Sequence, residues 1–241
     1  MKRSTSAVDD MVETMTKTSG FLKRHDNPIS KIPQLTRDQV EVGTLLGYGT
    51  FSFVHEVQAF DIDADENDAA QKREEETRPS LEEQQNVQDL IARGEHGELA
   101  IKHLRQDLME STLKFEEAAA DLIVEAKYLA ALDHPNIIKL RAVAKGGASA
   151  FESGQHDSFF LVIDKLHRTF KEKILEWQFL DDDSSMLMLS SKHCDAISIS
   201  HDRELLLEKI DLGHQIAKAL AYLHEHRLVY RGKTDSTNDN L

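Results

Sequence analysis

The amino-acid sequence predicts an α+β fold in which five strands and one long helix precede a mainly helical segment. Two observations predict it. Apolar and polar residues alternate in short runs between residues 40 and 163, as expected for strands, and a helical pattern separates the third run from the fourth. After residue 163, apolar residues recur at helical spacing instead. The chain is therefore expected to have a sheet-bearing part at 36–163 and a helical part at 164–241.

The bulk composition limits the class of protein. A chain of 241 residues that is 40% hydrophobic and 30% charged can bury a core and is typical of a soluble globular protein. No apolar run approaches the roughly 20 residues of a membrane helix, and the N-terminus resembles neither a secretory signal nor a transit peptide. The single cysteine, Cys194, excludes an internal disulfide and suits a reducing compartment. We expect a cytoplasmic or nuclear protein with no membrane partner.

Two segments are predicted to lie outside the folded core. Residues 1–35 are rich in Ser, Thr and Lys and lack periodicity, so we expect a disordered tail. Residues 61–92 contain eleven acidic and three basic residues, a local net charge of −8 within a total of −14. They are expected to form a solvated insertion, partly helical at most, because they contain few apolar residues. No basic stripe is visible elsewhere, so we expect no nucleic-acid partner.

The remaining elements are assigned from their periodicity. The predicted strands are 40–46, 51–57, 98–104, 137–144 and 158–163, and the predicted helices are 111–132, 169–179 and 204–225. The first long helix is expected to end before Pro135, because the residue that precedes a proline resists the helical conformation. A polar stretch through Ser200 separates the last two helices. The last helix is expected to bury a stripe formed by Leu205, Leu212, Ile216, Leu220 and Leu223.

A pair of glycines marks the turn between the first two strands. Gly47 and Gly49 lie within Leu46-Gly47-Tyr48-Gly49-Thr50-Phe51. Glycines at this spacing allow a hairpin backbone to approach phosphate groups, because no Cβ is in the way and positive φ is open to them. The alternative is an ordinary hairpin turn, in which the same spacing is common.

A lysine and a glutamate are predicted to pair inside the fold. Lys102 is predicted to face inward from strand 98–104, where an ammonium group without a partner would be costly to bury. Glu125 lies between Leu122 and Leu129, within the apolar stripe of its own helix. The two side chains would form an ion pair that holds a phosphate-binding lysine in place. The alternatives are that Lys102 points to solvent from an edge strand and that Glu125 reaches solvent at the margin of the stripe.

Together these features resemble the eukaryotic protein-kinase family. The motifs occur in the family's order: the glycine hairpin, Ala100-Ile101-Lys102, Glu125 nine residues before His134-Pro135-Asn136-Ile137, Phe160 to Asp164, and the helix at 216–224. The resemblance covers about residues 36–231, with two insertions. It implies a kinase-like N-terminal lobe at 36–163, with a five-stranded antiparallel sheet and one helix, and then a hinge and an incomplete helical C-terminal lobe.

The resemblance also implies ligands and roles. ATP and Mg²⁺ would be the cofactors, and a protein Ser or Thr would be the substrate. Lys102 would contact the α- and β-phosphates and pair with Glu125, and Arg231 would belong to the catalytic loop. The nucleotide-binding residues would be Leu46, Gly47, Gly49, Val54, Ala100, Lys102, Ile163 at the gatekeeper position, and Asp164 and Leu166 in the hinge.

The catalytic loop departs from the family pattern. Tyr230-Arg231-Gly232 stands where the family has His-Arg-Asp, so the carboxylate that would accept the substrate's proton is missing. Thr237 replaces the magnesium-binding asparagine, and no Asp-Phe-Gly segment follows. We therefore assign no metal ligand and expect the sequence to be truncated at this loop.

Three hypotheses about function remain open. The first is an ATP-dependent Ser/Thr protein kinase, of which this sequence is a part. The second is a pseudokinase, which binds nucleotide or acts as a scaffold without catalysis. The third is an interaction protein whose acidic insertion at 61–92 recruits a basic partner.

Overall fold

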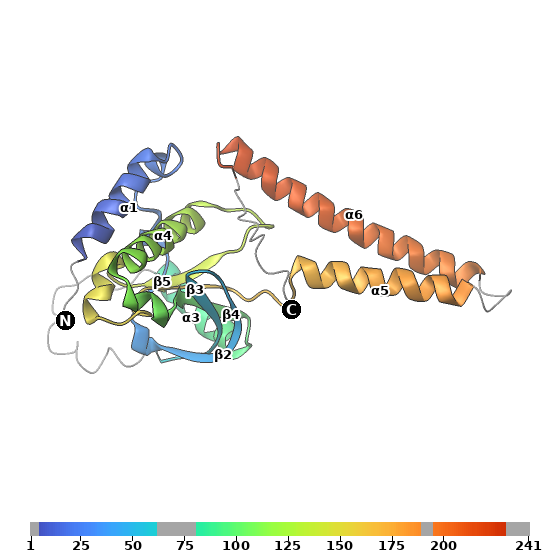
Figure 1. Ribbon diagram of the computed structural model, residues 1–241, viewed down its shortest axis with the longest axis horizontal. Coiled ribbons are helices and arrows are strands. Elements are labelled where there is room, and N and C mark those ends of the chain that lie inside the picture. The colour runs from blue at the N-terminus through green and yellow to red at the C-terminus, as the bar shows by residue number, and fades with distance from the viewer. Residues whose placement is uncertain (1–4, 62–80, 189–194, 230–241) are drawn as a thin grey trace. The chain divides into compact units, whose positions relative to one another are not determined.

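The computed structural model describes residues 5–61, 81–188 and 195–229 (Figure 1). The chain forms two compact units. The first consists of Met1–Asp133 and Ile137–Lys165, and the second of His134–Asn136 and Leu166–Leu241. The fold is α+β, as predicted, since the first unit contains a sheet and the second is helical.

Within the described residues, six strands form one mixed sheet in the order β1-β5-β6-β4-β3-β2. They are β1 (Gln34–Leu35), β2 (Val40–Tyr48), β3 (Ser52–Phe60), β4 (Leu99–Leu104), β5 (Leu140–Ala144) and β6 (Phe160–Asp164). The five predicted strands are all present and pair in antiparallel fashion.

The expectation of a purely antiparallel five-stranded sheet is wrong, because β1 adds a sixth strand that runs parallel to β5. The N–H of Val143 donates to the carbonyl of Pro33 at 3.0 Å, and the N–H of Lys145 donates to that of Leu35 at 2.8 Å. A strand of two residues is too short to produce an alternating pattern in the sequence, so periodicity could not reveal it.

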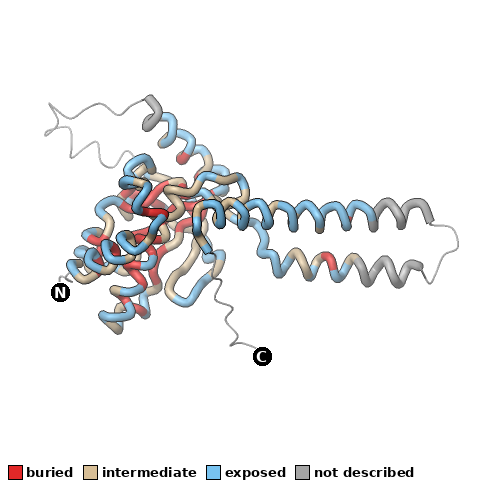
Figure 2. The backbone as a smooth tube through the Cα atoms, turned by 90° about the horizontal axis from the view of Figure 1, so that it is seen from above, coloured by how far each residue is buried: buried red, intermediate tan, exposed pale blue. Residues whose placement is uncertain are grey.

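The core of the first unit lies between the sheet and α4 (Thr112–Ala131), and the buried residues of Figure 2 gather there. α4 matches the predicted helix 111–132. It buries Phe115, Ala118 and Leu122, and the ring of Phe115 meets that of Phe151 edge-on at 5.1 Å. The run Ala118-Ala119-Ala120 is almost fully buried. Such small side chains allow the helix backbone to approach its neighbours closely.

The prediction of a disordered tail at 1–35 is wrong for the residues that the structure describes. α1 (Ser6–Thr18) packs against α4 and buries Val8 and Val12, and Phe21 and Leu22 are also buried. The hydroxyl of Tyr128 on α4 donates to Ser19 Oγ at 2.8 Å. Val8, Met11, Val12 and Met15 recur at helical spacing, but the Ser- and Thr-rich composition of the segment outweighed this short pattern in the prediction. Burial of this face against α4 orders the segment.

The expectation that the insertion at 61–92 is solvated and partly helical fits most of the residues described there, but it is wrong for Leu90, which is buried. Residues 62–80 lie outside the described part of the chain, but α3 (Leu81–Glu95) packs against β3 and buries Leu90. The polar majority of the segment concealed this buried anchor from the sequence analysis. Short 3₁₀ helices complete the unit: η1 (Leu22–Arg24), η2 (Pro28–Lys31), η3 (Arg37–Gln39), η5 (Gln106–Glu110) and η6 (Gly147–Ser153).

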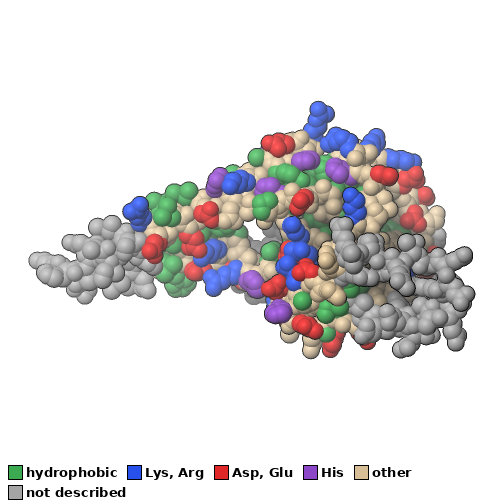
Figure 3. Space-filling view, turned by 180° about the vertical axis from the view of Figure 1, so that it is seen from behind, with side chains coloured by type: hydrophobic (Ala, Val, Ile, Leu, Met, Phe, Trp, Pro, Cys, Tyr) green, Lys and Arg blue, Asp and Glu red, His purple; other side chains and the backbone are tan. Residues whose placement is uncertain are grey.

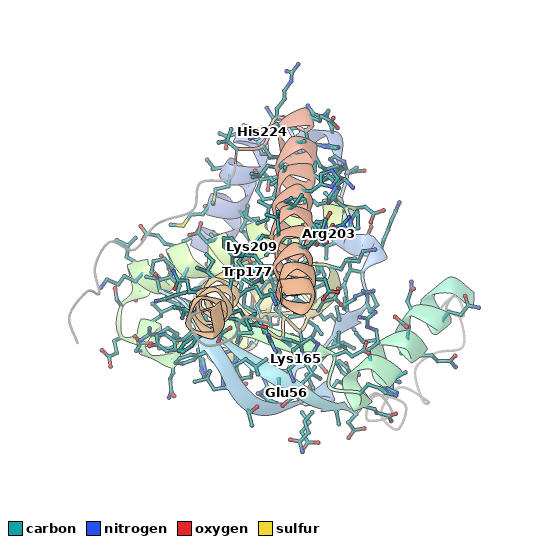
Figure 4. The ribbon with its side chains drawn as sticks, turned by 90° about the vertical axis from the view of Figure 1, so that its right-hand side faces the viewer. Glu56, Lys165, Trp177, Arg203, Lys209 and His224 are labelled. Atoms are coloured by element: carbon teal, nitrogen blue, oxygen red, sulfur yellow. The ribbon has the colours of Figure 1, made fainter. Side chains whose placement is uncertain are left out.

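The second unit is built on two helices that lie side by side, α5 (Phe170–Met188) and α6 (Asp195–Glu225) (Figures 1 and 2). Both are longer than predicted, because much of the polar stretch between them is helical. Trp177 is buried between them: its Nε1–H donates to Glu208 Oε2 at 3.0 Å, and the Lys173 and Lys209 ammonium groups lie 5.9 and 5.8 Å from its ring (Figure 4).

The predicted buried stripe of α6 is correct only in part. Leu205 is buried, but Ile216 and Leu220 are exposed. Figure 3 shows such hydrophobic side chains at the surface of the helical pair, among charged ones. No helix in the described part of the chain is both long and apolar enough to span a membrane.

Candidate functional site

The strand register aligns the residues expected to contact a nucleotide. Gly47 pairs with Val54, and Val54 pairs with Lys102. Ala100, two residues from Lys102, pairs with Ile163. Side chains directly opposite each other in antiparallel strands point to the same face, as do residues two apart on one strand. Val54, Ala100, Lys102 and Ile163 therefore share one face of the sheet.

The predicted pairing of Lys102 with Glu125 is confirmed. The Nζ atom of Lys102 lies 2.7 Å from both Oε1 and Oε2 of Glu125. The lysine side chain is 23% exposed and the glutamate side chain 40% exposed, so solvent screens the pair and it stabilises the fold by about 1 kcal/mol at most. Its main effect is positional. The ammonium group carries three N–H donors, and one carboxylate leaves at least one of them for another acceptor.

The glycine hairpin is present, but its glycines are not required by backbone strain. Gly47 and Gly49 are absent from the described residues with positive φ, contrary to the conformational reason that the sequence suggested. The N–H of Gly49 donates to the carbonyl of Ser52 at 2.8 Å and closes the turn. A Cβ built at Gly47 would meet no atom within 4 Å. The hairpin itself would tolerate a side chain there, and its absence leaves open space beside the backbone.

An apolar surface lies next to Lys102 on the same face. Ala100 is 2% exposed and Ile163 is 9% exposed, and Val54 is half-buried. Ala100 lies opposite Ile163 in the register of β4 and β6, and its small side chain projects little from the sheet.

A second ion pair borders this face at the end of β6. Glu56 pairs with Ala100 in the strand register and so lies on the same face. Its Oε1 accepts a hydrogen bond from the Lys165 ammonium group at 2.5 Å (Figure 4). The hydrogen bonds from Lys165 and Thr44 hold the pKa of the Glu56 carboxyl below its ordinary value. The Lys102–Glu125 pair and the Glu56–Lys165 pair thus border the apolar surface.

Other predicted site residues are distributed as follows. Asp164 ends β6, and its carboxylate is held by Arg141 and Arg93. Leu46 lies in β2 and is exposed. Leu166 belongs to the second unit and is 71% exposed. Arg231 lies outside the described residues.

Sequence reasoning missed the ionic partners around Asp164 and Lys165. Glu56, Arg93 and Arg141 come from three different elements, and each is far in sequence from its partner. The only available signal for Glu56 was its place two residues after Val54 on a strand, which puts it on the same face.

The opposite face of the sheet carries a histidine pair that the sequence did not reveal. The rings of His55 and His103 stack at 5.1 Å with their planes 8° apart, and His103 Nε2 lies 3.2 Å from His55 Nδ1. Since His103 Nδ1 lies 2.9 Å from the carbonyl of Leu104, which can only accept, Nδ1 carries the proton and Nε2 accepts from His55. Burial lowers the pKa of both imidazoles, and the Arg37 charge lowers that of His55 further.

An open hollow of about 850 Å³ lies beside η5 and does not include the Lys102 face. It is lined by Phe53, Arg105, Met109 and His156, among others. No group of three or more His, Cys, Asp or Glu side chains that could hold a metal ion occurs among the described residues. Residues 232–238, where the family has its catalytic aspartate and magnesium-binding asparagine, lie outside them.

Comparison with models of known protein families and with curated proteins found no match to this chain.

Proposed function

We propose that the first unit is the N-terminal lobe of a protein kinase and binds ATP on the Lys102 face of its sheet. The phosphates would lie against the glycine hairpin and Lys102. The adenine ring would lie on Val54, Ala100 and Ile163, with its edge toward the backbone of Asp164. The γ-phosphoryl group would pass to a Ser or Thr hydroxyl of a protein.

The observation that carries this proposal is the Lys102–Glu125 pair. A lysine on a central strand is held by both oxygens of a carboxylate from a helix, at 2.7 Å each, and it shares a face with an apolar surface. As a purely structural ion pair it would contribute little to the stability of the fold, because both side chains are partly exposed. An ammonium group that is already held in place can neutralise the charge of a phosphate group without reorganisation. The apolar side chains beside it would contact the nucleotide base.

The proposal is tested by nucleotide binding. We expect the folded wild-type chain to bind ATP in calorimetry, and Lys102→Met to weaken binding by about tenfold or more, because a hydrogen bond to a charged group is lost. Glu125→Gln should weaken binding less. Lys145→Met, which removes an exposed lysine of the same unit, is the matched control. A folded wild type that binds no ATP, or a Lys102→Met variant that binds as Lys145→Met does, would contradict the proposal.

A pseudokinase is the second candidate, and Gly232 favours it. Glycine at this position supplies no carboxylate to accept the proton of a substrate hydroxyl. The two candidates differ in transfer of labelled phosphate from ATP to a protein substrate. A pseudokinase would bind ATP and transfer nothing. Transfer by the wild-type chain that is lost in Lys102→Met would establish the enzyme.

A further inference from the structure

α3 is fixed rigidly to the start of β4. The helix ends in a Schellman motif: the N–H of Gly97 donates to the carbonyl of Gly94 at 2.9 Å, and the N–H of Glu98 donates to that of Arg93 at 3.0 Å. Gly97 has φ +66°, the left-handed conformation that this motif requires. Arg93 therefore sits in the last turn of α3 at a defined distance from β4.

α3 is also fixed to β3 by close packing. Gly94 is buried, and a Cβ built on it would lie 2.6 Å from a ring atom of Phe60. Only glycine allows the helix to approach the ring so closely. Leu90, one turn earlier, is 2% exposed. α3 is thus docked on the sheet both through Leu90 and at its C-terminal end.

This docking delivers a guanidinium group to the end of β6. Arg93 Nη2 lies 3.2 Å from Asp164 Oδ1 and 3.4 Å from Glu98 Oε2. Arg141 of β5 holds the same aspartate by both oxygens, with Nε to Oδ1 at 2.7 Å and Nη2 to Oδ2 at 3.2 Å. Two arginines from two elements therefore hold one carboxylate, and all three side chains are about a quarter exposed.

The backbone next to Asp164 is held as well. The N–H of Lys165 donates to the carbonyl of Glu98 at 2.8 Å, and the Lys165 ammonium group pairs with Glu56. The last residues of β6 are therefore tied to α3, β3 and β5. A carboxylate that is bound by two arginines cannot turn toward a base edge or pull the backbone with it.

We propose that Arg93 is a positioning residue for the nucleotide base, which it serves by holding Asp164 in place from α3. This inference rests on the proposed ATP site and adds that the C-terminal end of α3 is part of it. Arg93 lies on the side of Asp164 and not at Lys102, so it acts on the base half of the nucleotide and not on the phosphate half.

The test separates these halves by comparing ATP with inorganic tripolyphosphate, which has the phosphates alone. Arg93→Met keeps the length of the side chain and removes its charge. We expect it to weaken ATP binding about three- to tenfold, as for loss of a partly exposed charged contact, and to leave tripolyphosphate binding unchanged. Arg93→Lys should restore most of the ATP affinity, because one nitrogen makes the contact to Asp164. Gln88→Ala, on the exposed side of α3, is the control.

The outcomes discriminate between the two proposals. If wild type binds no ATP, the proposed function fails, and this inference fails with it. If wild type binds ATP and Arg93→Met binds it as Gln88→Ala does, only the inference fails. If Arg93→Met weakens ATP and tripolyphosphate equally, Arg93 is merely structural and the inference is overturned. If Arg93→Met does not fold, Arg93→Gln is measured against the same criteria.

Discussion

Phe21 provides the sharpest test of whether the N-terminal segment belongs to the folded unit. Its ring is 3% exposed. It stacks on Tyr128 of α4 with ring centroids 5.9 Å apart and planes 12° apart, and it contacts His25 at 4.4 Å. A disordered tail would lose nothing if this ring were removed. The substitution Phe21→Ala therefore separates the two descriptions of the segment.

The expected cost can be worked from the burial. Transfer of a phenylalanine side chain from the core to water costs about 1.5–3 kcal/mol, and the aromatic contact adds about 0.5–1.5 kcal/mol. The unfilled cavity raises the total toward the roughly 3–5 kcal/mol seen for buried Phe→Ala changes. The segment can undock from α4, so the loss is limited to its docking free energy. We expect about 2–4 kcal/mol.

The assay is urea denaturation followed by two signals. Far-UV circular dichroism reports both units, whereas fluorescence of Trp177, the single tryptophan of the sequence, reports the second unit. Phe21→Ala should lower the midpoint of the dichroism transition that belongs to the first unit. Tyr48→Ala is the matched control, since this ring belongs to the same unit and is 75% exposed, so its loss should cost about 0.5 kcal/mol or less. A change of that same small size in Phe21→Ala would refute the packing described here.

Two further predictions concern stability. Gly97→Ala should destabilise the first unit by about 1–2 kcal/mol, because alanine resists the left-handed conformation, and the new methyl group would lie 3.4 Å from Glu56 Oε1. Gly20→Ala, which meets no neighbour and lacks a positive φ, should be near neutral, and equal effects in the two variants would contradict this account. The stability of the first unit should also fall as the pH drops below about 6.5, because the pKa values of His55 and His103 are lowered mainly by burial and the unfolded chain takes up protons first. Urea midpoints measured across this range should decline less in His55→Gln/His103→Gln, and an identical decline would show that the pair is not responsible.

The elements that the sequence predicted well are those with long, regular patterns. α4 has twenty residues of helical periodicity and a proline beyond its end, and it was placed within one residue. The alternation of β4 was equally clear. Glu125 could be predicted to meet Lys102 because each residue was out of place in its own pattern. A charged residue on an apolar stripe favours a charged partner, and Lys102 was the candidate.

The elements that sequence reasoning missed depend on contacts between distant segments. α1 is ordered by a few apolar side chains that find α4, and α3 by Leu90 and the close contact of Gly94 with Phe60. Both segments do carry short apolar patterns at helical spacing, such as Val8, Met11, Val12 and Met15 in α1, but their polar composition outweighed these patterns in the prediction. No pattern in the sequence marks Arg93 and Arg141 as partners of Asp164, because only the fold brings these three side chains together.

The two misjudged segments bear on the candidate site from opposite ends. The N-terminal segment packs on α4 at Tyr128, one turn from Glu125, so it fixes the helix that aligns Lys102. α3 fixes the end of β6 through Arg93. A carboxylate displaced by even an ångström would lose its bidentate contact with the lysine. The kinase-like motifs would supply the groups that contact a nucleotide. The N-terminal segment and α3, which carry no such motif, would hold those groups in position. Binding should therefore respond to changes in α1 and α3 that touch no ligand, and variants such as Phe21→Ala should lower ATP affinity even where the first unit remains folded.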